Sequence, residues 1–160
     1  MKKDLVNRLR EVLLDGKWIA NTNLKQEITS CHWESAIMSV EGLNSIASLT
    51  FHLHYYLSGV LNVFLGGNLE ISDQFSFDMK SIDCEEEWLE LVNDFLKSAE
   101  LYICCVEDMD DERLYQTFVK HEYGNYWRNI EAQIEHSYYH LGQIVLIKKI
   151  IAQRNVSTEW

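Results

Sequence analysis

Near its C-terminus the chain reads Ile134-Glu135-His136-Ser137-Tyr138-Tyr139-His140-Leu141-Gly142-Gln143-Ile144, and the fold is expected to form around this stretch. Two histidines four residues apart in a helix lie on one face, with their Cβ atoms roughly 5–6 Å from each other. Two imidazoles at this spacing can bind one metal ion. The spacing is also common by chance, so a third ligand elsewhere decides between a metal site and ordinary helix residues.

Length and composition predict one globular domain over residues 1–160. The chain is 47% hydrophobic and 12% aromatic, which excludes a disordered polymer and supplies an adequate core. It contains no proline, which favours long uninterrupted helices. A net charge of −11 repels phosphate backbones and anionic lipids, so neither nucleic acid nor a membrane is an expected partner.

The sequence also predicts a cytoplasmic protein. Residues 1–4 lead into an amphipathic segment that lacks the apolar core of a signal peptide. The longest apolar stretch, residues 55–65, contains Ser58 and Asn62 and is too short to span a bilayer. The four cysteines show no Cys-x-x-Cys spacing and are expected to be reduced, packed thiols: Cys31, Cys84, Cys104 and Cys105.

Apolar residues spaced by three and four, without a convincing strand, predict an all-α four-helix bundle. The first helix is expected to be broken: it covers residues 3–14, stops near Gly16 and resumes over residues 18–28. A connector is expected over residues 29–43, with one helical turn. The three other long helices are expected over residues 44–65, 84–108 and 126–153.

Local signals mark the segment between the second and third long helices. Gly66-Gly67 is expected to end the helix over residues 44–65. Apolar residues alternate over residues 68–82, but an isolated strand would have no partner there, so an extended crossing loop is expected. Asp83 with Glu86 resembles a capping box at the start of the third long helix.

His52 is the candidate for the third ligand, because it lies midway along the second long helix. If the second and fourth helices pack side by side, His52 can meet His136 and His140. Three protein nitrogens with an open position commonly hold catalytic zinc. Two residues turn a helix by about 200°, so His52 and His54 cannot both face the fourth helix. The remaining histidines are interpreted as ordinary surface or core residues: His32, His54 and His121.

Other metal and catalytic motifs are absent from the sequence. None of the six histidines follows a glutamate by three residues, as a di-iron bundle would require. His121-Glu122 has Asn125 at the place of the second histidine of a zinc-protease motif. There is no glycine-rich phosphate loop, and no local pattern indicates a serine or cysteine nucleophile.

Both histidine stretches resemble motifs of a known family. Residues 44–52, Asn44-Ser45-Ile46-Ala47-Ser48-Leu49-Thr50-Phe51-His52, are similar to the second-helix motif of the DinB/YfiT-like superfamily of metalloenzymes. Residues 136–144 resemble its final-helix His-x-x-x-His-x-Gly-Gln motif, and the likeness covers nearly the whole chain. It implies an up-up-down-down four-helix bundle, a homodimer, and a divalent metal on His52, His136 and His140. Imidazole ligands suit zinc or nickel.

The resemblance implies a metal-dependent enzyme but leaves its reaction open. Some members resemble S-transferases or isomerases that use bacillithiol or mycothiol, in which the metal activates the thiol as thiolate. The expected partners are therefore a small thiol and an electrophilic small molecule. The alternative is a non-catalytic, metal-stabilised bundle that acts as a scaffold or partner-binding module. Polar residues near the histidines are expected either to orient ligands and bind substrate or only to pack: Tyr55, Tyr56, Tyr138, Tyr139 and Gln143.

Overall fold

The computed structural model describes the backbone of residues 2–157 and the side chains of residues 2–154. Within this part of the chain every regular element is helical, which confirms the all-α prediction. No helix in it is long and apolar enough to cross a membrane. The four longest helices are α1 (Lys2–Leu13), α4 (Ile46–Phe64), α5 (Glu85–Asp108) and α7 (Tyr126–Ser157). The short elements are α2 (Leu24–Thr29), α3 (Trp33–Ile37), α6 (Asp111–Leu114) and the 3-10 turns η1 (Asp73–Phe75) and η2 (His121–Tyr123).

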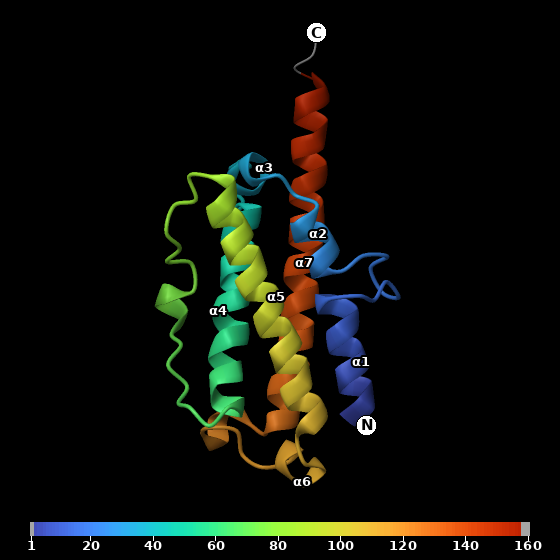
Figure 1. The fold of residues 1–160 in the computed structure, drawn as a ribbon, viewed down its shortest axis with the longest axis vertical. Coiled ribbons are helices and arrows are strands. Elements are labelled where there is room, and N and C mark those ends of the chain that lie inside the picture. Colours follow the sequence, from blue (N-terminus) through green and yellow to red (C-terminus); the bar gives the residue numbers. More distant parts are fainter. Residues whose placement is uncertain (1, 158–160) are drawn as a thin grey trace.

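The four long helices lie side by side, α4 against α5 and α7, and α1 against the same two (Figure 1). α1 and α7 run in one direction, and α4 and α5 run in the other. The order along the chain is therefore up-down-down-up, and the expected up-up-down-down order is wrong. The reason lies in the connections. Residues 65–84 return along the whole of α4, about 28 Å, whereas α2 and α3 join α1 to α4 over one end.

The predicted apolar stripe of α5 forms the centre of the core. Trp88, Phe95 and Tyr102 are each at most 2% exposed. Trp88 satisfies its indole N–H by donating to the backbone carbonyl of Cys31 at 3.0 Å. The hydroxyl of Tyr102 has no hydrogen-bond partner among the described residues. The core is thus apolar and tightly closed, and it holds α4 and α7 in a fixed relation.

α4 begins and ends at well-defined caps. The hydroxyl of Ser45 accepts a hydrogen bond from the backbone N–H of Ser48. At the other end Gly66 has a φ of +93°, and Gly67 donates its N–H to the carbonyl of Asn62 at 2.8 Å. Gly66 also donates its N–H to the carbonyl of Val63 at 3.1 Å, and the two bonds form a Schellman motif, which confirms Gly66-Gly67 as the helix end.

Two helix starts differ from the prediction. A helix was expected from residue 18, but residues 18–20 form turns and the Trp18 side chain is 89% exposed. Asn21 has a positive φ, and α2 begins only at Leu24. The N-cap residue of α5 is Cys84, not Asp83. Counting from Cys84, the carboxylate in the third helical position belongs to Glu87, and it accepts the N–H of Asp83 at 2.7 Å. The expected pairing with Glu86 is therefore wrong by one residue.

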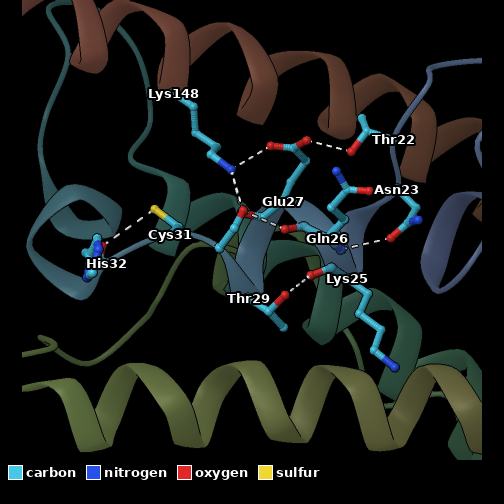
Figure 2. A network of polar contacts seen from close by, with 10 residues as sticks. Thr22, Asn23, Lys25, Gln26, Glu27, Thr29, Cys31, His32 and Lys148 are labelled. Carbon is cyan, nitrogen blue, oxygen red and sulfur yellow. Dashed lines mark hydrogen bonds and ion pairs between the residues drawn. The ribbon is translucent and has the colours of Figure 1, made fainter.

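A polar network fixes α2 against α7 (Figure 2). The ammonium group of Lys148 donates to the carboxylate of Glu27 at 2.7 Å, to the carbonyl of Glu27 at 2.9 Å and to the hydroxyl of Ser30 at 2.9 Å. Thr22 donates its hydroxyl to the same carboxylate at 2.6 Å. Lys148 thereby caps the C-terminal end of α2, where a cation is favoured.

Candidate metal centre

Three histidines from two helices converge at one point. His136 Nε2 lies 3.1 Å from His52 Nε2 and 2.9 Å from His140 Nε2. One ring nitrogen of each residue lies within 4.8 Å of the others, and the three could hold a metal ion. The antiparallel packing of α4 on α7 creates this meeting point, and the four-residue spacing on α7 supplies two of its members.

The hydrogen bonds behind the rings determine which nitrogens carry protons. His52 Nδ1 lies 3.2 Å from the carbonyl of Ser76, which can only accept, so Nδ1 carries the proton. His140 Nδ1 lies 2.7 Å from Gln143 Oε1 and carries its proton for the same reason. Both Nε2 lone pairs therefore point at His136 Nε2. If His136 Nε2 carries a proton, it can donate to only one of these two lone pairs. A cation among the three Nε2 atoms would instead bind the lone pair of each.

The geometry and chemistry of these donors fit a divalent transition metal. Zinc–imidazole bonds are about 2.0–2.1 Å long, so ligand nitrogens around a tetrahedral ion are roughly 3.3 Å apart. The observed 2.9 and 3.1 Å from His136 to its two neighbours are only slightly shorter than this. Imidazole Nε2 atoms oriented by a carbonyl and an amide are a common ligand arrangement.

Burial keeps these histidines neutral, as metal ligands must be. Burial, together with the adjacent His140 and His52, lowers the pKa of His136 to about 4. Burial also lowers the pKa of His52, with His140 contributing. Burial lowers the pKa of His140 as well, against the opposing effect of the hydrogen bond that His140 donates to Gln143. At neutral pH all three lone pairs are available.

The crossing segment, residues 65–84 between α4 and α5, covers the histidines from one side. Phe77 stacks on the ring of His52, with ring centroids 4.1 Å apart and planes at 14°. Tyr56 stands edge-on to His52 at 5.0 Å and donates its hydroxyl to Asp73 at 2.6 Å. Tyr55 holds the same segment, because its hydroxyl accepts the N–H of Ser72 at 2.9 Å. Tyr55 and Tyr56 thus bind the segment that orients His52.

The other polar candidates have different environments. Gln143 contacts His140 directly, as described above. The Tyr139 side chain is 63% exposed, with its ring centroid 4.8 Å from that of His140. Tyr138 points away from the histidines and donates to Glu11 of α1 at 3.1 Å, so it joins two helices. His54 Nε2 lies 3.2 Å from the hydroxyl of Ser98 on α5, so His54 faces away from α7, as its helix position predicted.

Residues that the sequence did not single out complete the site. Ser76 and Phe77 contact His52, and Asp73 contacts Tyr56. The alternating apolar residues of the crossing loop were the available signal that this segment packs against a helix. That signal could not identify a backbone carbonyl as the partner of His52.

A cavity of about 450 Å³ opens beside His52 and His136. Its size suits a small organic molecule. Apolar side chains form much of its wall, and Tyr56, Asp73, Asn129 and Gln133 add polar atoms. A ligand in this space would contact the histidine cluster directly.

Comparison with known proteins identifies the family. The family model described as "Protein of unknown function (DUF1572)" matches residues 1–158, so the chain belongs to this family. The family is DinB/YfiT-like, in agreement with the resemblance carried by the two histidine motifs. No curated protein and no solved structure matches the chain at a significant level.

Proposed function

We propose that this protein is a metal-dependent enzyme on a four-helix bundle, in which His52, His136 and His140 hold one divalent ion, zinc or nickel. The convergence of three Nε2 atoms carries this proposal. A bound ion of this kind supplies Lewis acidity, which lowers the pKa of a thiol or water that contacts it. The chain provides the ligands, their orientation and the space for a substrate.

The cavity favours an enzyme over a scaffold. A structural site is usually closed by four protein ligands, whereas a catalytic site keeps one position open. Here two of the three histidines, His52 and His136, border about 450 Å³ of space that a small molecule can enter. A metal that served only to stabilise the fold would gain nothing from that space.

The reaction we propose is the transfer of a low-molecular-weight thiol to an electrophile. The sulfur forms a bond to an electrophilic carbon while the bond from that carbon to its leaving group breaks, and the thiol proton is released to water. The apolar walls of the cavity exclude water from the electrophile. Hydrogen bonds to Ser76 and Gln143 keep the protons of His52 and His140 on Nδ1, so that the Nε2 lone pairs can bind the metal.

A panel of thiols with a chromogenic electrophile tests this function. Bacillithiol, mycothiol, glutathione, cysteine and cysteamine are each mixed with the metal-loaded protein and an aryl halide. We expect a rate above background with at least one thiol, lost after chelation and in His136→Ala, and retained in His54→Ala. If no thiol gives a metal-dependent rate, the scaffold function replaces the enzyme.

We also propose a cytoplasmic homodimer. Tyr139 and Leu146 are 63% and 54% exposed on α7, and a Cβ at Gly142 between them would meet no atom within 4 Å. Such a face allows close approach of a second helix. Four free cysteines are consistent with a reducing compartment. Sedimentation at micromolar concentration that gives only the 18.8 kDa species would exclude the dimer.

A further inference from the structure

The wall of the cavity beside the histidines carries no lysine or arginine. Val60, Leu69, Ile71 and Phe118 provide apolar surface. Lys120 lies outside this wall, 5.7 Å from the centroid of the Tyr123 ring, and pairs with Glu122 at 3.8 Å. An anionic group on a ligand would therefore find no cationic side chain on the wall.

The polar atoms that the wall leaves available are mainly acceptors. The side-chain NH₂ of Asn129 donates to the carbonyls of Tyr123 and Asn125, both at 2.8 Å, which leaves its Oδ1 to accept. Tyr56 uses its hydroxyl proton in the bond to Asp73. The carboxylate of Asp73 has further lone pairs and a full negative charge. A ligand that carries donors can therefore pair with Asp73 and Asn129.

We propose that this cavity selects a small substrate that carries an ammonium or hydroxyl group and rejects one that carries a carboxylate or phosphate. Asp73, oriented by Tyr56, is the residue that determines this selectivity. Donors on the ligand pair with Asp73 and Asn129, while a carboxylate is repelled by the same oxygens and loses its hydration without compensation. The inference rests on the proposed function only in naming the molecule as a substrate.

The substrate class of the proposed enzyme follows. In this proposal the sulfur of the substrate lies beside the histidines and its donor group lies beside Asp73. The ring of Tyr56 contacts His52 and His136 and its hydroxyl binds Asp73, so a small molecule can reach both ends of the cavity. Small amino-thiols and hydroxy-thiols fit this arrangement. Thiols with carboxylates, of the glutathione type, do not. The net charge of −11 adds to the repulsion of anions.

Three isosteric probes test the selectivity without metal or turnover. Butylammonium, 1-butanol and butyrate are titrated into chelator-treated, isotopically labelled protein at low ionic strength, and amide shifts at Asn129 and Ala132 report binding. The variant Asp73→Asn removes the charge while its amide oxygen still accepts from Tyr56. Asp78→Asn is the matched control, because Asp78 is an exposed carboxylate of the same segment that does not line this cavity.

We expect butylammonium to bind about tenfold more tightly than butyrate, a ratio that falls to about two or less in Asp73→Asn and stays unchanged in Asp78→Asn. Butyrate that binds as tightly as butylammonium overturns the inference. So does an equal change of the ratio in both variants, or the lack of any shift with all three probes. A failed thiol-transfer assay would instead overturn the proposed function, since this titration involves neither metal nor reaction.

Discussion

His52 Nε2 lies 3.1 Å from His136 Nε2, although 84 residues separate the two along the chain. Two features produce this contact. α4 and α7 run antiparallel, so the middle of one helix meets the middle of the other. The carbonyl of Ser76 then fixes the ring of His52 from the crossing segment. The candidate metal centre therefore depends on a loop as well as on two helices.

Gln143 should contribute to metal affinity through His140. Its amide oxygen accepts the Nδ1 proton of His140 at 2.7 Å and holds the ring in place. We expect Gln143→Leu to weaken metal binding about tenfold, the lower end of the usual effect of such partners. Competition with a chromophoric chelator measures this affinity. Tyr139→Phe is the control, because it keeps the ring beside His140. Equal affinities in Gln143→Leu and wild type would show that the hydrogen bond has no role.

Gly59 should tolerate no side chain, whereas Gly142 should benefit from one. A Cβ on Gly59 would clash with Cγ2 of Ile71, and a Cβ on Gly142 would meet nothing within 4 Å. Both glycines are inside helices, where alanine is favoured by roughly 0.5–1 kcal/mol. We expect Gly142→Ala to raise the free energy of unfolding of the monomer by about that much. Gly59→Ala should lose about 1–2 kcal/mol, because overpacking outweighs propensity. Urea unfolding compares them, and equal changes would mean that Ile71 moves aside freely.

The buried hydroxyl of Tyr102 should be dispensable. It is inaccessible and has no partner among the described residues, so folding strips its water without a replacement bond. Tyr102→Phe should leave the free energy of unfolding unchanged or raise it by about 1 kcal/mol. A calorimetric loss of more than about 1 kcal/mol would show that the hydroxyl has a partner, such as a buried water.

Glu27 should stabilise the fold in a pH-dependent manner. Burial raises its pKa, but hydrogen bonds from Lys148 and Thr22 outweigh burial and hold the pKa below its ordinary value of 4.5. Its stabilisation is therefore present above that ordinary value and is lost as the pH falls through the lower, folded-state pKa. We expect Glu27→Gln to cost about 1–2 kcal/mol at pH 7 and progressively less below pH 4.5.

An exposed ion pair provides the comparison for Glu27. Arg10 and Asp15 lie 2.7 Å apart with side chains 48% and 56% exposed, so Asp15→Asn should cost less than about 0.5 kcal/mol. Urea unfolding at several pH values measures both variants. A cost for Glu27→Gln that grows on acidification would reverse the sign of the expected linkage.

The sequence predicted the helices well because their signals are local. Spacing by three and four gave α4, α5 and α7, and Gly66-Gly67 marked the end of α4. The directions of the helices were harder to predict, since the apolar pattern of a helix does not show which neighbour the helix packs against. The expected order of directions came from the family resemblance, and it was wrong. The prediction of a helix from residue 18 onward was wrong, because apolar spacing reveals neither the N-cap at Asn23 nor the positive φ of Asn21.

In the candidate site, too, some features were predictable from the sequence and others were not. His136 and His140 follow from one helical spacing. Helix geometry allows only one of His52 and His54 to face the fourth helix, and the resemblance to the second-helix motif selects His52. The contacts from the crossing segment did not follow, because a backbone carbonyl such as that of Ser76 carries no sequence signal. Tyr138 lies within two residues of both His136 and His140 yet contacts Glu11, since its side chain leaves the opposite side of α7.

Metal content of four single variants tests the three-histidine site most directly. Protein purified without a metal-affinity tag is loaded with zinc or nickel, dialysed and analysed for metal per chain, and the dissociation constant is measured by chelator competition. We expect about one ion per chain in wild type and in His54→Ala. His52→Ala, His136→Ala and His140→Ala should each bind at least about a hundredfold more weakly, because two imidazoles remain. Full metal content in all four variants, or loss of metal in His54→Ala with retention in His52→Ala, would contradict the site.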